Sequence, residues 1–371
     1  MNLALFFTFD YSLETWNKTG TLNREVKLFN HLYKDGISTT YFTWGNFIDE
    51  KYYGDIITPK IVPLYEKIKF RKNKLFRIIN SFFVVFRIKK EIENIDIIYQ
   101  NQLQGSWIPI LLKIVYKKKL IIRTGYDMLS FAKSENKSKL KIFLYEILTF
   151  VTLFFSDIYT VTSNEDYNFL SSKYKKLKHK LFVIPNWVEA NKKEITKKSN
   201  LKILSVGRLV KQKNFDHLFR ELSKIRNDFE LDIIGKGPDE KFLKDLAKEL
   251  NLKVNFLGNF SHQELMKKFH EYNFFVTTAI FEGNPKTVLE AMASGCVVLA
   301  SDIPNHRSII NSNFNGVLFS FRKNDLKNTL LKTANNTSIM KQISLNAIKS
   351  MESNNSFEHI RRLTLDILYK L

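Results

Sequence analysis

Cysteine is almost absent from this chain of 371 residues, which contains a single one, Cys296. One cysteine excludes a disulfide framework and a zinc site built from cysteines, and it suits a reducing cytoplasm. Cys296 opens an apolar run, so we expect a buried and unreactive thiol. The chain also lacks solenoid-type repeats and extended low-complexity tracts, which excludes repeat architectures.

Long hydrophobic runs are missing as well. The longest charge-free apolar stretch near the middle of the chain, ILTFVTLFFS at residues 147–156, is too short to span a bilayer. The stretch MNLALFFTFDYS at residues 1–12 has neither a basic leader nor a small-residue cleavage site, so it predicts a first strand and not a signal peptide. We therefore expect a cytoplasmic protein without a transmembrane segment.

Acidic residues are few relative to basic ones, 37 against 58, which gives a net charge of +21. An AT-rich genome can supply excess lysine without any functional cause. The charge is uneven, however: residues 1–50 sum to −2, whereas residues 51–90 hold 11 basic and 2 acidic side chains, a net +9. This local excess of positive charge, and not the net charge of the whole chain, suggests an anionic binding partner.

Cations and phenylalanines alternate in a segment of the basic region, residues 67–90. Such a mixture fits a helix lying on an anionic membrane surface. Nucleic-acid binding uses the same chemistry, and a solvated helix face packed on its own domain is the third interpretation. The residues concerned are Lys67, Lys69, Arg71, Lys72, Lys74, Arg77, Arg87, Lys89 and Lys90, with Phe70, Phe76, Phe82, Phe83 and Phe86.

Short apolar runs rich in β-branched and aromatic residues alternate with longer amphipathic segments along the whole chain. This pattern predicts α/β architecture with parallel sheets, and the length predicts two doubly wound domains. We expect an N-terminal domain at 1–187, a linker at 188–200, a C-terminal domain at 201–355 and a helix at 356–371 that crosses back onto the first domain. The strand candidates are LALFFTFD, STTYFTW, DIIYQNQ, KLIIRTG, IYTVTS and LFVIPN, then LKILSVGR, LDIIGKG, VNFLGN, FFVTTA, CVVLAS and GVLFS.

Open parallel sheets bind ligands at the carboxyl ends of their strands. Three strand candidates of the second half end at Gly207, at Gly235 and just before Phe281, so their ends should share one rim. Arg208 and Lys213 follow the first of these ends. A guanidinium and an ammonium together can neutralise a diphosphate, although each alone is also an ordinary surface cation.

Two glutamates, Glu282 and Glu290, lie eight residues apart in the stretch FEGNPKTVLEAMASG. Asn284 is a good helix cap and Pro285 suits a first helical position, so we expect a helix from about Pro285. Its exposed N–H groups favour an anion such as a phosphate. Glu290 would lie among apolar residues, where a carboxylate needs a partner. Both acids could face one ligand, or they could be a helix-start acid and a partly exposed helical glutamate.

The segments SVGRL, KNFD, IIGKGP, VNFLGN and FEGNPKTVLEAMASGCVVLAS, taken in order, resemble the nucleotide-sugar half of the retaining glycosyltransferases of family four. The resemblance covers most of residues 201–305. It implies the GT-B fold, in which two Rossmann-like domains face a central cleft. Glu282 and Glu290 fit the E-x7-E signature of the family, with the flanking Gly-x-Pro and LEAMA-x-G present.

The resemblance also implies the roles of the site residues. Glu290 would accept hydrogen bonds from the donor ribose, and Glu282 would lie near the transferred sugar and act with Arg208 and Lys213 in catalysis. No Asp-x-Asp pair is present, so we expect no divalent metal and no cofactor besides the nucleotide-sugar donor. The remaining donor-binding candidates are Gly283, Asn284, Pro285, Lys286, Thr287, Gly207, Gly235 and Gly258.

The first half resembles the family less closely. SLETWNKTGTLNREV is similar to its glycine-containing first loop and following helix, which places Gly20 on that loop. Many members carry a histidine after a strand of this domain, but KLIIRTGYD has none. We expect Arg123 or Tyr126 to contribute to the sugar or acceptor pocket instead. The seven histidines show no pairing typical of a metal site, and we interpret them as surface or capping residues.

The resemblance implies transfer of a sugar from a UDP- or GDP-linked donor to a glycan or polyprenyl-linked acceptor in cell-surface polysaccharide or glycoconjugate assembly, such as lipopolysaccharide or capsule. Residues 67–90 would then hold the protein as a peripheral protein on the inner face of the membrane. Two alternatives are a GT-B sugar-nucleotide epimerase, which needs no acceptor, and a basic nucleic-acid-binding protein. The second gives no role to Glu282 and Glu290, so we expect no nucleic-acid partner.

Overall fold

The computed structural model describes residues 1–190, 201–225 and 229–371. They divide into two compact units. The chain passes between the units four times, on either side of the short segment Ser163–Glu165, at Ile184–Pro185 and at Ile360–Arg361. The first unit comprises Met1–Thr162, Asp166–Ile184 and Arg361–Leu371, and the second comprises Ser163–Glu165 and Pro185–Ile360.

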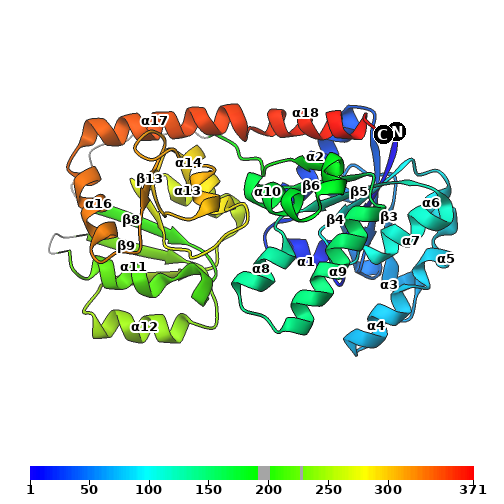
Figure 1. The fold of residues 1–371 in the computed structure, drawn as a ribbon, viewed down its shortest axis with the longest axis horizontal. Coiled ribbons are helices and arrows are strands. Elements are labelled where there is room, and N and C mark those ends of the chain that lie inside the picture. Colours follow the sequence, from blue (N-terminus) through cyan, green and yellow to red (C-terminus); the bar gives the residue numbers. More distant parts are fainter. Residues whose placement is uncertain (191–200, 226–228) are drawn as a thin grey trace. The chain divides into compact units, whose positions relative to one another are not determined.

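A seven-stranded parallel sheet forms the centre of the first unit, with the order β3-β2-β1-β4-β5-β6-β7 (Figure 1). The six strands expected from the sequence are present. The short edge strand β3 was not predicted, because three residues ending in proline carry no periodic signal. The strands are β1 (Asn2–Phe6), β2 (Ser38–Thr43), β3 (Ile61–Pro63), β4 (Ile97–Asn101), β5 (Lys119–Thr124), β6 (Ile158–Val161) and β7 (Leu181–Val183).

Helices surround this sheet, and α2 packs on it by burying one apolar stripe. In α2 the buried residues are Leu22, Val26, Phe29 and Leu32, at the spacing of one helical face. The elements are α1 (Leu13–Lys18), α2 (Leu22–Lys34), η1 (Phe47–Gly54), α3 (Leu64–Lys67), α4 (Lys74–Ser81), α5 (Val84–Arg87), α6 (Lys89–Glu93), α7 (Trp107–Tyr116), α8 (Met128–Ser134), α9 (Lys139–Phe155), α10 (Asn164–Lys173) and η2 (Lys175–Lys180).

The second unit contains a six-stranded parallel sheet with the order β10-β9-β8-β11-β12-β13. All six strands expected here are confirmed. Because the sheet is covered on both faces, its strands are continuous apolar runs, which made them easy to recognise. The strands are β8 (Leu201–Val206), β9 (Phe229–Ile234), β10 (Val254–Gly258), β11 (Phe274–Thr277), β12 (Val297–Ser301) and β13 (Val317–Phe319).

Two hydrophobic clusters fill the two faces of this sheet. Ile203 belongs to one cluster and its neighbour Leu204 to the other, as expected from alternation along a strand. Cys296 is buried in the second cluster, as predicted. The helices are η3 (Lys211–Lys213), α11 (Phe215–Leu222), α12 (Glu240–Glu249), α13 (His262–Phe269), α14 (Lys286–Ala293), α15 (Pro304–Arg307), α16 (Asp325–Ala334) and α17 (Thr337–Asn354).

The last helix, α18 (Phe357–Leu368), returns the chain to the first unit, in agreement with the prediction. Arg361 anchors it there, since its Nη1 donates to both carboxylate oxygens of Asp35, at 2.5 and 2.6 Å. The stretch expected to be a linker begins within the second unit, because Val188 is buried in its core and bridges to Ser356. The rest of that stretch, residues 191–200, lies outside the described residues.

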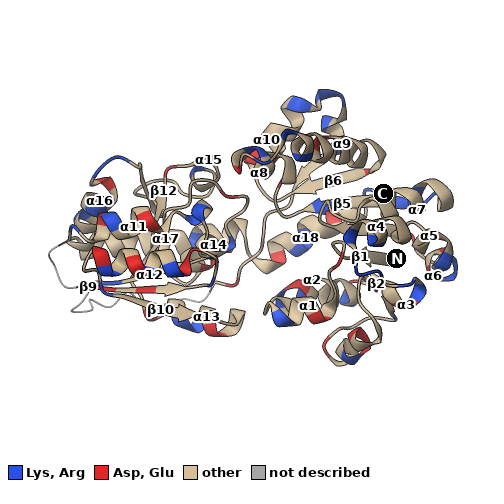
Figure 2. Ribbon diagram, turned by 90° about the horizontal axis from the view of Figure 1, so that it is seen from below, with Lys and Arg blue, Asp and Glu red and all other residues tan. Residues whose placement is uncertain are grey.

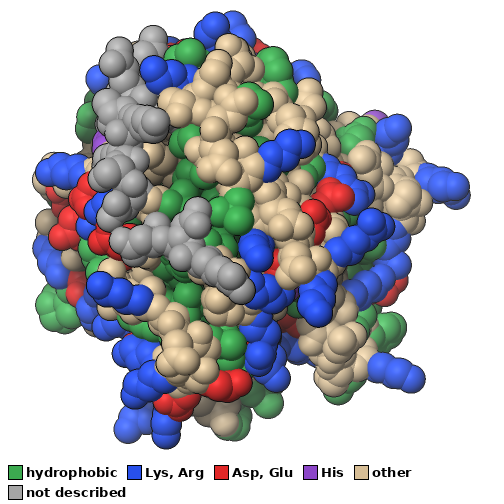
Figure 3. Space-filling view, turned by 90° about the vertical axis from the view of Figure 1, so that its left-hand side faces the viewer, with side chains coloured by type: hydrophobic (Ala, Val, Ile, Leu, Met, Phe, Trp, Pro, Cys, Tyr) green, Lys and Arg blue, Asp and Glu red, His purple; other side chains and the backbone are tan. Residues whose placement is uncertain are grey.

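In the described part of the chain, no helix is both long and apolar enough to cross a bilayer. On the face that Figure 3 presents, made largely by the second unit, Lys and Arg side chains are scattered between acidic and hydrophobic ones.

Candidate active site

Three glycines bring the carboxyl ends of neighbouring strands together in the second unit. A Cβ on Gly235 would lie 1.9 Å from the carbonyl oxygen of Gly207, and the φ of Gly235 is +144°. The Gly235 N–H donates to the carbonyl of Gly258 at 2.7 Å, and the Gly207 N–H donates to Ile234 at 3.0 Å. A side chain at Gly235 would push these backbones apart, so glycine is required there for the close approach.

The loop after β8 is tied to the loop after β11. Thr278 Oγ1 donates to the carbonyls of Lys213 and Asn214 at 3.0 and 2.9 Å, and the Ile280 N–H donates to Gln212 at 2.9 Å. Asn214 has a φ of +53°, a conformation that asparagine tolerates better than most residues. These bonds fix the two loops to each other at the rim where the site was expected.

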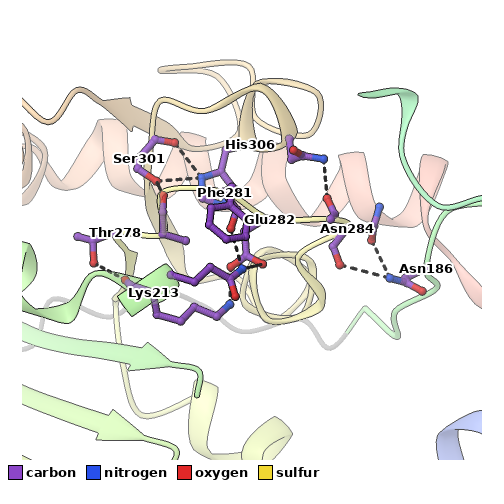
Figure 4. A network of polar contacts seen from close by, with 12 residues as sticks. Asn186, Lys213, Thr278, Phe281, Glu282, Asn284, Ser301 and His306 are labelled. Atoms are coloured by element: carbon purple, nitrogen blue, oxygen red, sulfur yellow. Dashed lines mark hydrogen bonds and ion pairs between the residues drawn. The ribbon is translucent and has the colours of Figure 1, made fainter. Parts of the chain in front are cut away.

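Lys213 and Glu282 form an ion pair across these loops (Figure 4). The Lys213 ammonium donates to Oε1 of Glu282, and only 16% and 9% of the two side chains are exposed. Gly207 leaves room for the lysine, since a Cβ there would lie 3.1 Å from Lys213 Cε. Gln212 supports the glutamate loop by donating to the carbonyl of Phe281 at 2.7 Å.

Arg208 follows directly after the end of β8 and is exposed. Among the described residues its guanidinium has no ion-pair or hydrogen-bond partner. The rim therefore holds a lysine neutralised by Glu282 and an arginine whose charge is uncompensated by the described residues. Such a guanidinium can bind a phosphate with two parallel hydrogen bonds.

The helix that follows Glu282 starts one residue later than predicted, with Pro285 as its N-cap and Lys286 and Thr287 in its first turn. The expected cap by Asn284 is wrong, because its Oδ1 accepts a hydrogen bond from Asn186 at 2.9 Å and no side chain caps this described helix. Uncapped N–H groups at a helix start favour an anion. The carbonyl of Gly283 accepts from Asn305 at 2.7 Å, which holds the loop in place.

Glu290 lies inside this helix and is 4% exposed, so it is not a partly exposed helical glutamate. Its Oε1 lies 3.3 Å from Nε2 of His262, the first residue of α13. His262 follows the N-cap Ser261, which forms a capping box with Glu264. The interpretation of this histidine as a surface or capping residue was incomplete, because nothing in the sequence indicates that α13 and α14 meet at these two side chains.

The interpretation of His306 as a surface or capping residue was wrong. This histidine is completely buried, with Nδ1 at 2.8 Å from the carbonyl of Ser301. Burial lowers its pKa, and the nearby charge of Glu282 opposes this shift. Ser301 Oγ in turn donates to Ala279 at 2.5 Å, so His306 supports the loop that carries Glu282 (Figure 4). The stretch SDIPNH is largely polar and carries no signal of burial.

The candidates of the first half all belong to the first unit. Gly20 ends the loop after α1 with a φ of +70°, as a glycine-containing loop requires. Arg123 lies in β5 with Nη1 3.5 Å from Oδ1 of Asn101, and Tyr126 is 39% exposed with its ring 4.8 Å from that of Phe131. Asp127, which was not among the predicted residues, caps α8 by accepting from the Ser130 N–H at 2.6 Å.

No group of three or more His, Cys, Asp or Glu side chains within residues 1–190, 201–225 and 229–371 could hold a metal ion. The rim of the second unit thus offers two cations, an uncapped helix start and two largely buried carboxylates. This combination can bind an anionic group through the cations and the helix start, and hydroxyl groups through the carboxylates.

Residues 188–350 match the family model of the glycosyl transferases group 1. An uncharacterized glycosyltransferase of Methanocaldococcus jannaschii is 26% identical over 301 residues, which are 75% of this chain and 71% of that protein. The N-acetylgalactosamine-N,N'-diacetylbacillosaminyl-diphospho-undecaprenol 4-alpha-N-acetylgalactosaminyltransferase of Campylobacter jejuni is 36% identical over 100 residues, 27% of each chain. Among solved structures, Anabaena HepE in complex with UDP and glucose has a TM-score of 0.77 at 15% identity, with 100% of both chains covered.

The family match covers the strand ends, both cations and both glutamates described above. The likeness to HepE extends over both units and agrees with two parallel sheets of Rossmann type. Residues 188–350, in the second unit, therefore match the glycosyl transferases group 1, and the chain is a glycosyltransferase with the GT-B fold.

Proposed function

We propose that this protein transfers a sugar, with retention of anomeric configuration and without a divalent metal, from a UDP- or GDP-linked donor. The acceptor is a glycan or a polyprenyl-linked glycan in cell-surface polysaccharide or glycoconjugate assembly. The observation that carries the proposal is the Lys213–Glu282 ion pair beside the exposed Arg208, at the rim formed by Gly207 and Gly235.

The donor diphosphate binds Arg208, Lys213 and the start of α14. These groups supply positive charge where negative charge develops as the sugar leaves, which is the role that a metal plays in other sites. Lys213 exchanges its contact with Glu282 for a phosphate oxygen, and Glu282 then accepts from a sugar hydroxyl. Glu290 accepts hydrogen bonds from the ribose.

In the transfer step, the bond from the anomeric carbon to the phosphate oxygen breaks, and a bond from that carbon to the acceptor oxygen forms on the same face of the sugar. The acceptor proton passes to the leaving phosphate oxygen. No carboxylate base is required, which is compatible with a Glu282 that is already paired with a cation.

A lipid-linked acceptor is supported by the name of the Campylobacter relative, which contains diphospho-undecaprenol. The membrane contact through residues 67–90 is supported by the exposure of most of its cations. Lys67 and Arg77 are exceptions, because they pair with Glu91 and Asp10 within the unit. We place the protein on the inner face of the membrane. The cations that stay exposed are Lys69, Arg71, Lys72, Lys74, Arg87, Lys89 and Lys90.

A thermal-shift screen of nucleotides and sugar nucleotides tests the donor class. A ligand at 100 times its dissociation constant should stabilise the fold by about 2.7 kcal/mol. The stabilising donor is then incubated with polyprenyl-linked glycans, and the anomeric configuration of the product is read by NMR. An inverted product would refute retention, and turnover of the donor to an epimer without acceptor would refute the transferase assignment.

A further inference from the structure

Helix α9 exposes a row of large apolar side chains. Its exposed positions are linked by spacings of three and four residues, with Phe143 and Leu144 adjacent, which places them on one face of the helix. A face of this length and composition on a water-exposed helix indicates a partner. The residues and their exposures are Leu140 67%, Phe143 58%, Leu144 56%, Ile147 44%, Phe150 46% and Phe154 52%.

The opposite face of α9 is packed against the unit and is partly polar. Its buried residues are Thr149, Thr152 and Leu153, and Thr152 Oγ1 lies 3.1 Å from Oγ of Ser106 at the start of α7. Threonine hydroxyls thus face inward while phenylalanines face outward. A helix solvated by water shows the reverse arrangement, because its apolar stripe turns toward the core.

A second apolar face lies on the other side of α7. Ser81, the last residue of α4, accepts a hydrogen bond from Nε1 of Trp107 at 2.9 Å, so the start of α7 contacts both α4 and α9. Figure 1 shows α4 and α9 reaching the same edge of the first unit. The exposed residues of α4, of the turn after it and of α5 are Leu75 64%, Phe76 60%, Ile79 52%, Phe82 42%, Phe83 58% and Phe86 70%.

Exposed cations precede both helices. Lys69, Arg71, Lys72 and Lys74 lie before and at the start of α4, and Lys137, Lys139 and Lys141 lie around the start of α9 (Figure 2). The nearby acids are already paired, Glu135 with Lys137 and Glu146 with Lys173. A second copy of this chain would bring like charges together at these positions, whereas an anionic lipid surface is complementary to them.

We propose that α9 and α4 form one membrane-inserting surface, in which the apolar faces of both helices enter the boundary between headgroups and acyl chains of an anionic bilayer. The cations at the two helix starts contact the lipid phosphates. This inference deepens the membrane contact proposed for residues 67–90, and it makes α9 the main apolar anchor. Donor binding belongs to the second unit, so it can be measured independently of this surface.

Vesicle flotation tests the role of α9. The substitutions Phe143→Ser, Leu144→Ser and Ile147→Ser together should weaken binding to vesicles of phosphatidylcholine and phosphatidylglycerol by about tenfold or more, because three apolar side chains no longer leave water. The matched control replaces exposed apolar residues of the second unit, Phe242→Ser and Leu345→Ser, which are 55% and 54% exposed. Equal binding of the parent, the α9 variant and the control would overturn the proposal.

Depth of insertion can be read from a single labelled position. Cys296 is the only cysteine and is buried, so a cysteine introduced by Phe143→Cys can be labelled selectively with an environment-sensitive fluorophore. We expect its emission to shift to the blue on anionic vesicles, and we expect no shift for Phe242→Cys. An unshifted Phe143→Cys spectrum on vesicles that the protein binds would refute insertion of α9.

Two further outcomes separate the rival partners. Sedimentation without lipid that gives twice the chain mass, reduced to one chain mass by the α9 substitutions, would show that a second copy covers this face and would overturn the proposal. If the parent bound oligonucleotides and the α9 variant did not, a nucleic acid would be the partner of this face, and the proposal would also be overturned. Unchanged donor stabilisation in the α9 variant, together with lost flotation, would support the surface irrespective of the sugar that is transferred.

Discussion

The ammonium group of Lys213 contacts the carboxylate of Glu282, although the two residues are 69 positions apart in the chain. Lys213 follows β8 and Glu282 follows β11, and these strands are neighbours in the sheet. The contact therefore brings the side chain proposed to bind the donor phosphate, Lys213, within hydrogen-bond reach of the side chain proposed to bind the sugar, Glu282. It also means that the lysine is held in position before any donor arrives.

Loss of either proposed diphosphate ligand should slow transfer. Lys213→Ala and Arg208→Ala should each reduce kcat by about a hundredfold or more, the scale for removing one charge partner of a transition state. Lys211→Ala is the matched control, because Lys211 is an exposed cation on the same turn. Steady-state kinetics at saturating donor measures the effect, and parental turnover in both variants would remove the two residues from the mechanism.

Glu290→Ala should weaken nucleotide binding, since the carboxylate is buried and is proposed to accept the ribose hydroxyls. Isothermal titration calorimetry with UDP and GDP measures the affinity, and we expect a loss of about tenfold or more for a hydrogen bond to a charged group. Glu249→Ala, an exposed carboxylate at the end of α12, is the control. An unchanged affinity with an intact fold would contradict the assignment.

Chelation should leave transfer largely intact, because Arg208, Lys213 and the start of α14 are proposed to replace a metal at the diphosphate. The measurement compares initial rates after dialysis against EDTA with rates after addition of magnesium or manganese. If chelation abolished transfer and manganese restored it, the cations of the protein would not be sufficient to stabilise the leaving diphosphate.

Asp127→Asn should stabilise the protein at pH 8 but not at pH 4. Burial raises the pKa of Asp127 to about 7, and the charge of Asp166 adds to the shift. The folded state therefore binds more protons than the unfolded state between about pH 4 and pH 7, and stability falls as pH rises through this window. At about 1.4 kcal/mol per pKa unit, the parent should lose a few kcal/mol that the variant keeps.

Urea denaturation at both pH values measures this difference for Asp127→Asn and for the exposed control Asp245→Asn. Asparagine can retain the N-cap bond to the Ser130 N–H, so loss of the helix cap should not obscure the result. An equal effect of Asp127→Asn at both pH values would contradict the raised pKa.

Gly235→Ala should destabilise the second unit and weaken donor binding. The added Cβ would meet the Gly207 carbonyl, and a φ of +144° is strained for alanine. We expect a loss of about 1–3 kcal/mol or more in the free energy of unfolding. Gly54→Ala is the control, because a Cβ on Gly54 would meet nothing within 4 Å. A variant as stable as the control would show that the loop after β9 can move away from Gly207.

The strands were predictable because strands buried on both faces have continuous apolar sequences. Strand β3 was missed because its three residues are too few to form such a run. Gly207 and Gly235 could be placed at one rim from the parallel topology alone. The sequence placed Lys213 and Glu282 at the same rim, but it did not predict that the two side chains form an ion pair. A contact between residues 69 positions apart depends on the order of the strands in the sheet.

The burial of individual polar residues could not be predicted from the sequence. His306 bonds to the backbone of Ser301, and Asp10 pairs with Arg77 although 67 residues separate them. Sequence periodicity does not reveal such contacts, because each one provides a hydrogen-bond partner for single polar atoms. Periodicity reveals only the burial of a whole face of a helix or strand. The length of the apolar stretch that contains Phe150 indicates that it does not span a bilayer, but it does not indicate which of its residues are exposed. The structure shows that its hydrophobic face points outward.

The return of α18 has a consequence for the order in which the protein matures on the ribosome. Asp35 is synthesised early, but its partner Arg361 emerges only after the whole of the second unit. The second unit can thus acquire all its strands and close around its two clusters while the first unit still waits for the residues from Arg361 onward. Contrary to the usual progression of domains from the N-terminus, the first unit to be started is the last to be finished.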